Sequence, residues 1–313
     1  MTQRRTPSVL GKIVTINAGG YTARIAEVGA TLVSLTGPTG RQLVLPASET
    51  EINTAYRGAL LAPWPNRLED GRYTWEGAEY QAPITEVERN NSNHGLLAWQ
   101  RFSLQATELE ENHSLTAHLD LVPQPGYPFQ LEFTVTYTVS GEGLHCRLSA
   151  TNIGADTAPY AMGAHPYLVA SGEPETPGAV DEWTLRAPVT YQLPVTDRMI
   201  PLNGDQELPA NRRLDEGLAL VGVNLDDAFG GITREGDGSA VVRLTTADNT
   251  GTGLSFGEDI AWLQCYTDGE TRRGVAVEPM SAPANAFNSG TDLTRLEPGE
   301  THTATWTIFE ITA

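Results

Sequence analysis

The stretch LEFTVTYTV, residues 131–139, alternates apolar and polar side chains along its whole length. Side chains at every second position of a β-strand point to the same face, so this pattern predicts a strand with one buried and one solvated face. The residues expected on the buried face are Leu131, Phe133, Val135, Tyr137 and Val139.

The same alternation recurs in HSLTAHLDL (113–121) and in THTATWTIF (301–309). Turn residues separate such runs, as in VSGEGLHC (139–146), which joins two expected strands. The 31 glycines and 20 prolines are spread along the chain and favour many short strands over long helices. Helical periodicity is weak, and only short helical turns are expected, for example around SETEINTAY (48–56).

These features predict an all-β fold: a large antiparallel β-sandwich with few short helices. A length of 313 residues would allow two domains, but no shift in composition marks a linker, and we expect a single domain over residues 1–313. The Pro- and Gly-rich stretch ASGEPETPGAV (170–180) is expected to form a long surface loop.

The chain is acidic, with a net charge of −19, and Lys12 is its single lysine. This charge argues against nucleic acid or an anionic membrane as a partner, because no basic patch is available to neutralise phosphates. The scarcity of lysine excludes a P-loop, which needs Gly-Lys-Ser/Thr, and disfavours a Schiff-base enzyme.

Two cysteines, Cys146 and Cys265, lie in apolar stretches without CxxC spacing and are expected to be free, buried thiols. The N-terminus lacks the apolar run of about 7–15 residues that a signal peptide needs. No stretch approaches the roughly 18 apolar residues of a membrane span. We therefore expect a cytoplasmic protein without a membrane partner, and the composition leaves its oligomeric state open.

The six histidines differ in their surroundings. Four lie on polar strand faces, in a turn or at a strand start and are expected to be solvated or structural: His113, His118, His145 and His302. His94 lies in RNNSNHGLLAW (89–99), a polar loop of the kind that often carries ligand contacts on a β-scaffold. A structural role is the alternative for His94.

His165 and Glu278 both directly precede a proline, in GAHPYLVA (163–170) and GVAVEPMSAP (274–283). Proline disfavours helical backbone at the residue before it, so each side chain is expected to be held at the end of an extended run. Glu278 ends an apolar run, where desolvation would raise its pKa and suit it to act as a base. The two residues form a candidate acid/base pair, with an exposed strand-end glutamate as the alternative.

Adjacent carboxylates in NLDDAFGG (224–231), Asp226 and Asp227, are candidates for binding a metal or sugar hydroxyls, although such pairs are usually turn residues. GLSFG (253–257) matches the nucleophile elbow of serine hydrolases, but the sequence that follows predicts a strand where the elbow requires a helix. No zinc site is expected, because HExxH is absent.

Six stretches, in this order, resemble the motifs of the aldose 1-epimerase (galactose mutarotase) family and extend across most of the chain. They are WPNRLEDGRY (64–73), NNSNHGLL (90–97), AHPYL (164–168), LDDAF (225–229), LQCYT (263–267) and VAVEPMSAPANAFNSG (275–290). The resemblance implies a large β-sandwich that interconverts the α and β anomers of a free sugar without a cofactor.

By this resemblance, Glu278 is the general base that takes the proton of the C1 hydroxyl, and His165 is the general acid that protonates the ring oxygen. The ring opens to the aldehyde, and rotation about C1–C2 followed by reclosure gives the other anomer. His94 is implied to be a second histidine near the ring oxygen. The residues expected to bind the sugar are Arg67, Asp226, Asn66, Gln264 and Tyr167.

Two departures from the family pattern weaken a prediction of galactose specificity. Asp227 stands where many galactose mutarotases carry histidine, and Leu96 stands in place of a second glycine. Related branches act on glucose 6-phosphate or sulfoquinovose, and these substrates stay open.

A neutral aldohexose is favoured, because lysine is scarce and Arg67 is the one arginine in a motif that is expected to contact the sugar. Arg72, near the end of the first stretch, and Arg101, shortly after the second, are candidates for a second contact to an anion. A non-catalytic sugar-binding β-sandwich is the alternative from another class, but it would not need both His165 and Glu278.

Overall fold

The computed structural model describes residues 8–171, 176–202 and 206–313. Within these ranges the chain is mostly antiparallel β-structure, as predicted, with the one short α-helix α1 (Ala286–Ser289) and four 3-10 turns. In the same ranges no helix is long and apolar enough to cross a membrane. The division into a single domain stays a prediction.

The larger of two main sheets has nine strands in the order β19-β16-β21-β22-β26-β12-β11-β10-β9. Their bounds are β9 (Ser103–Glu108), β10 (His113–Leu121), β11 (Leu131–Ser140), β12 (Gly143–Asn152), β16 (Thr184–Arg186), β19 (Leu218–Ala219), β21 (Ala240–Thr245), β22 (Gly251–Phe256) and β26 (Thr301–Ile311). The apolar positions of residues 131–139 are all buried on one face of β11, which confirms the predicted alternation.

The second main sheet has eight strands, in the order β18-β17-β20-β23-β24-β14-β4 with β15 also paired to β24. Their bounds are β4 (Leu60–Leu61), β14 (Gly163–Ala164), β15 (Tyr167–Leu168), β17 (Tyr191–Leu193), β18 (Gln206–Glu207), β20 (Asp226–Gly230), β23 (Trp262–Thr267) and β24 (Val275–Met280). One continuous core joins the two sheets and includes Leu148 of the first and Leu263 of the second.

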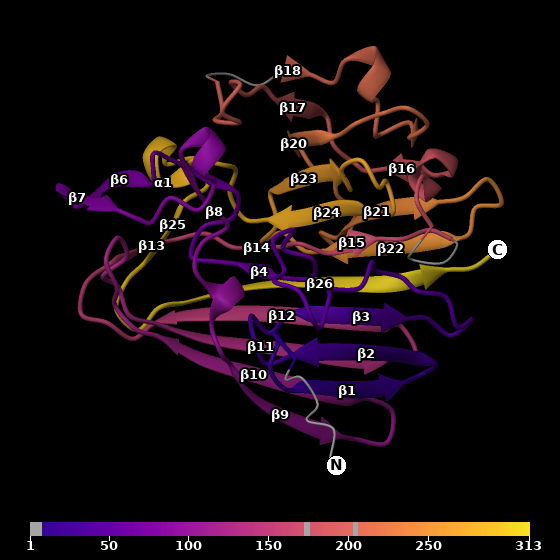
Figure 1. Ribbon diagram of the computed structural model, residues 1–313, viewed down its shortest axis with the longest axis horizontal. Coiled ribbons are helices and arrows are strands. Elements are labelled where there is room, and N and C mark those ends of the chain that lie inside the picture. The colour runs from indigo at the N-terminus through magenta and orange to yellow at the C-terminus, as the bar shows by residue number, and fades with distance from the viewer. Residues whose placement is uncertain (1–7, 172–175, 203–205) are drawn as a thin grey trace, which may run out of the picture.

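A three-stranded sheet covers part of the nine-stranded one. It consists of β1 (Ile13–Ala18), β2 (Tyr21–Ala26) and β3 (Leu32–Thr36). Figure 1 shows these indigo strands in front of β10–β12, and residues of β1 and β2 contact β10, β11 and β12. Strands β15, β20, β23 and β24 of the eight-stranded sheet carry side chains of the candidate site.

The prediction of a helical turn around 48–56 is wrong, because this segment consists of bends, a turn and backbone without regular structure. Ser48 accepts hydrogen bonds from the backbone N–H groups of Thr50 and Glu51, and such local side-chain bonds compete with helix formation. In the expected loop 170–180, residues 172–175 lie outside the described residues. Of its described residues, Thr176 and Pro177 are exposed, as expected of a surface loop, while its ends Ala170 and Val180 are buried.

Several smaller predictions can be checked against the fold. Cys146 and Cys265 are free and buried, as expected. Residues 253–256 of GLSFG form the end of β22, and the chain continues by a turn into β23, so the strand–turn–helix of a nucleophile elbow is absent there.

Candidate active site

The central pair of the site is His165 and Glu278, which β14 and β24 bring together. His165 Nε2 lies 3.2 Å from Glu278 Oε1. The two residues are 5% and 2% exposed, so the alternative of an exposed strand-end glutamate is wrong. His165 directly follows β14 as predicted, but Glu278 lies inside β24, because the strand continues through Pro279 to Met280.

Burial moves the pKa values of this pair in opposite directions. It raises the pKa of Glu278 well above its ordinary value; Asp226 adds to this shift, and Arg67 opposes it. Burial lowers the pKa of His165 to about 3, and the positive charge of Arg57 also lowers it. Burial therefore favours the neutral form of both groups, a protonated Glu278 carboxyl beside a neutral imidazole.

The backbone and plane of His165 are both constrained. Its N–H donates to Ala59 O and its carbonyl accepts from Gly58 N, each at 2.9 Å. The ring of Tyr167 stacks on the imidazole with centroids 5.0 Å apart and planes 16° apart. The hydroxyl of Tyr167 donates to Ala55 O at 3.0 Å, so the phenol that fixes His165 is itself anchored.

His94 is placed by a second strand pair. β5 (Arg67–Glu69) runs antiparallel to β8 (Asn91–Asn93), which brings two distant motifs side by side. His94 N donates to Asn66 O at 2.9 Å, and Asn66 N donates to His94 Nδ1 at 3.1 Å. A backbone N–H can only donate, so Nδ1 is an acceptor and the proton of the neutral ring is on Nε2.

The environment also keeps His94 neutral. Burial lowers its pKa well below the ordinary value, with further contributions from His165 and Arg67. The two imidazole centroids lie 5.2 Å apart at 77°. Gly95 follows with φ +68°, and a Cβ there would lie 2.3 Å from Ala62 O, so the turn that presents His94 requires glycine.

A chain of hydrogen-bonded polar groups forms another wall of the site. Asn66 Nδ2 donates to Gln264 Oε1 at 3.2 Å, and Gln264 Nε2 donates to Asp226 Oδ1 at 2.7 Å. Arg67 donates through Nε and Nη2 to the Glu86 carboxylate, and its Nη2 lies 3.9 Å from Asp226 Oδ2. The ion pair with Glu86 thereby holds the Arg67 guanidinium beside Asp226.

These side chains line one pocket of about 310 Å³. All eight residues predicted from the sequence for catalysis or sugar binding line it: Asn66, Arg67, His94, His165, Tyr167, Asp226, Gln264 and Glu278. Their roles stay predictions.

Seven more residues line the same pocket and were not predicted: Thr54, Ala55, Tyr56, Arg89, Asn93, Tyr266 and Asp268. Tyr266 had a signal, since it is two positions from Gln264 on β23 and therefore on the same face. Nothing in residues 54–56 pointed to the site.

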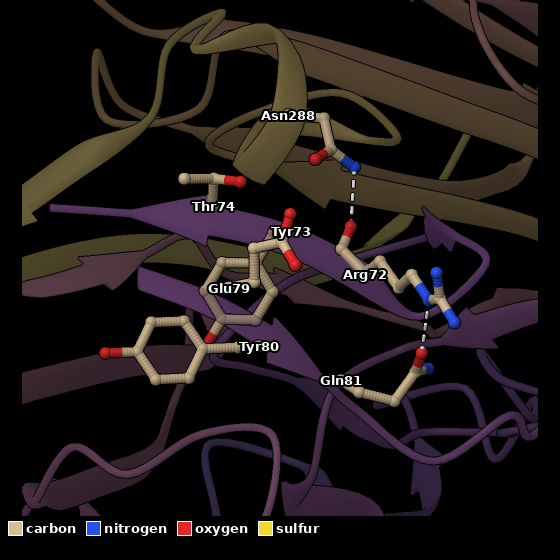
Figure 2. Close-up of a pocket in the computed structure, with 7 residues that line it drawn as sticks. All are labelled: Arg72, Tyr73, Thr74, Glu79, Tyr80, Gln81 and Asn288. Atoms are coloured by element: carbon tan, nitrogen blue, oxygen red, sulfur yellow. Dashed lines mark hydrogen bonds between the residues drawn. The ribbon is translucent and has the colours of Figure 1, made fainter. Parts of the chain in front are cut away.

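The two further arginines considered as anion contacts, Arg72 and Arg101, lie outside this pocket. Figure 2 shows Arg72 on the hairpin of β6 (Arg72–Trp75) and β7 (Ala78–Gln81), where its Nε donates to Gln81 Oε1 at 2.7 Å. Arg101 is ion-paired with Glu27.

Asp227 also does not line the pocket. Unlike Asp226, it accepts hydrogen bonds from Gln192 and Arg212. The arginines that line the pocket are Arg67 and Arg89.

Three residues of the pocket carry donor atoms of the kind that bind metal ions. His94, His165 and Glu278 offer ligand-type atoms within 4.8 Å of one another. Coordination through His94 Nε2 would move its proton to Nδ1, which faces the N–H of Asn66. The arrangement therefore suits donation by His94 and proton exchange between His165 and Glu278 better than a metal ion.

Comparison with known proteins identifies the family. The sequence profile of aldose 1-epimerase matches residues 12–308, so the chain belongs to the aldose 1-epimerase family. It is 36% identical over 304 residues to the uncharacterized protein YihR of Escherichia coli K12, covering 96% of this chain and 93% of that protein. The galactose mutarotase of Rattus norvegicus is 30% identical over 146 residues, 47% of this chain and 41% of that protein.

Solved structures show the same fold at low sequence identity. A galactose mutarotase-like protein of Clostridium acetobutylicum superposes with a TM-score of 0.86 at 18% identity, covering 96% of this chain and 95% of that one. The galactose 1-epimerase of Lactobacillus acidophilus gives a TM-score of 0.77 at 18% identity, with the same coverage of 96% and 95%. The fold is galactose mutarotase-like, as the resemblance implied.

Proposed function

We propose that this protein interconverts the α and β anomers of a free hexose by opening and reclosing its pyranose ring. The observation that carries the proposal is the 3.2 Å contact between His165 Nε2 and Glu278 Oε1 in a buried pocket. Such a pair can take a proton from one substrate oxygen and give one to another. The pocket volume of about 310 Å³ is in the range of small-molecule sites.

The reaction begins when the shared proton moves from Glu278 to His165, which leaves a carboxylate and an imidazolium. Glu278 then takes the proton of the C1 hydroxyl, the O1 electrons form the C1=O bond, and the C1–O5 bond breaks as His165 protonates O5. Rotation about C1–C2 and attack of the O5 hydroxyl on the other face of C1 reverse each transfer. Proton number and charge balance over the cycle.

The remaining pocket residues orient the sugar. His94 presents an Nε2–H donor beside His165, suited to the ring oxygen as its charge develops. Asp226 accepts and Arg67 donates, so together they match the two sides of a sugar hydroxyl. Gln264 and Asn66 hold Asp226 in place through their hydrogen-bond chain.

A neutral aldohexose is the first candidate substrate. The two pocket arginines, Arg67 and Arg89, are each ion-paired with Glu86, and the carboxylates of Asp226 and Asp268 also line the pocket. An anionic aldose is the second candidate. It rests on one observation: two guanidinium groups share the single carboxylate of Glu86, which leaves one positive charge among these three residues, with Asp226 Oδ2 3.9 Å from Arg67 Nη2.

Exchange NMR on glucose, galactose, glucose 6-phosphate and sulfoquinovose at equal concentration and physiological salt tests the proposal. The enzyme should accelerate anomer exchange of a neutral hexose. A rate constant at least tenfold higher for either anion than for both neutral sugars would select the second candidate, and Arg89→Gln should then slow the anion alone. Saturable binding without accelerated exchange of any sugar would contradict both and indicate a sugar-binding protein.

A further inference from the structure

Tyr56 contacts both pocket histidines. Its ring centroid lies 4.6 Å from that of His94, edge-on at 60°. It lies 6.4 Å from that of His165, with the planes 20° apart. Because Tyr167 also stacks on His165 within 16° of parallel, the catalytic imidazole has tyrosine rings as two of its neighbours.

The backbone of Tyr56 is in the left-handed region, with φ +55°. This conformation is uncommon for a bulky residue and persists only where the surroundings enforce it. Here the side chain of Asn53 donates to Arg57 O at 2.8 Å and accepts from Arg57 N at 2.9 Å. Gly58 N, two residues after Tyr56, donates to His165 O at 2.9 Å, so the turn is joined directly to the catalytic histidine.

The other edges of Tyr56 are also occupied. Trp99, which is 48% exposed, lies 5.9 Å from it on a 3-10 turn (Leu97–Trp99). Burial raises the pKa of the Tyr56 hydroxyl, and the Thr85 side chain acts in the opposite direction. The ring thus lies between partly solvated groups and the two imidazoles.

We propose that Tyr56 is a positioning residue whose ring holds His94 and His165 in their reactive orientations. This inference rests on the proposed epimerase function. An aromatic ring against two imidazoles restricts their rotation and excludes water from them, and small errors in placement are costly in acid–base catalysis. The strained turn is the structural cost of placing the ring there.

Two substitutions separate the ring from the hydroxyl. Tyr56→Phe keeps the ring, while Tyr56→Asn removes it and still tolerates the left-handed backbone. With the fastest-exchanging of the four sugars as probe, Tyr56→Asn should lower kcat about 10–100-fold and change KM less than about threefold. Tyr56→Phe should stay within about threefold of wild type. Tyr80→Asn, which removes a tyrosine ring outside the pocket, is the control and should keep wild-type kcat.

Histidine ¹⁵N NMR gives a readout that needs no turnover. Wild type and Tyr56→Phe should show His94 as the single Nε2–H tautomer, and Tyr56→Asn should show mixed or averaged tautomers. Unchanged kcat and tautomer in Tyr56→Asn, or a loss confined to KM, would overturn the inference. If the asparagine variant does not fold, Tyr56→Gly replaces it under the same criteria. Absence of exchange in wild type contradicts the epimerase function, while the NMR result still decides the role of Tyr56.

Discussion

His165 Nε2 and Glu278 Oε1 lie 3.2 Å apart, and both side chains are almost completely buried. Burial favours the neutral form of each group, so the pair holds one proton and no net charge. The same total of one proton is present when the pair is a carboxylate and an imidazolium, which is the form that acts on the sugar. The resting and reactive forms therefore differ by one short proton transfer.

The first prediction concerns the pH dependence of kcat/KM. The pair loses its base when a second proton binds, which requires a pH near the His165 pKa of about 3. It loses its acid when the last proton leaves, at the raised pKa of Glu278. We expect kcat/KM to be flat between an acid-side fall near pH 3 and a second fall where Glu278 loses its proton. An acid-side fall near the ordinary histidine pKa of about 6.5 would contradict this.

The second prediction concerns stability. A carboxyl whose pKa is raised on folding contributes stability that is complete below its unfolded pKa and is lost as pH rises through the folded pKa. Glutamine does not ionise, so the Tm of Glu278→Gln relative to wild type should increase from pH 4 to pH 8. Glu88→Gln, on an exposed side chain, is the control, and a constant difference for Glu278→Gln would refute the raised pKa.

The third prediction tests the tautomer of His94. If His94 acts as an Nε2–H donor, glutamine can partly replace it and leucine cannot. We expect His94→Gln to retain about tenfold more kcat/KM than His94→Leu, the value of one hydrogen bond of about 1.4 kcal/mol. Equal losses in the two variants would show that donation at this position is unimportant.

The fourth prediction is independence from metal ions. The Asn66 N–H at His94 Nδ1 disfavours coordination through Nε2, so chelation should not affect the site. Dialysis against EDTA should leave the exchange rate unchanged, and elemental analysis should find no stoichiometric metal. Loss of activity that zinc or magnesium restores would overturn this reading of the His94, His165 and Glu278 cluster.

Local sequence patterns predicted the strands because a half-buried strand shows its burial directly in its alternation, as residues 131–139 do. The proline after His165 likewise marked the end of β14. The proline after Glu278 misled, because β24 continues through it and Glu278 is buried within the strand. The backbone preference of a residue before proline does not reveal whether its strand continues to pair with neighbouring strands.

The pocket was harder to predict where it depends on contacts between distant segments. Arg72 and Arg101 are close in sequence to pocket residues but point elsewhere, whereas Arg89 reaches the pocket through the β5–β8 pair. Tyr56 meets the histidines only because its turn is hydrogen-bonded to His165. No periodic or motif signal marks Tyr56 in the sequence, and Arg89 is indicated only by its place at the start of the polar loop 89–99.

The most direct test of the acid–base account is the anomer-exchange rate of Glu278→Gln and His165→Asn, each measured beside wild type with the same sugar. Circular dichroism and Tm show whether each variant is folded, and Glu88→Gln serves as the matched control. The account predicts that each folded variant loses a factor of about 10² or more in exchange rate while the control keeps the wild-type rate. Near-wild-type exchange in either variant would contradict it.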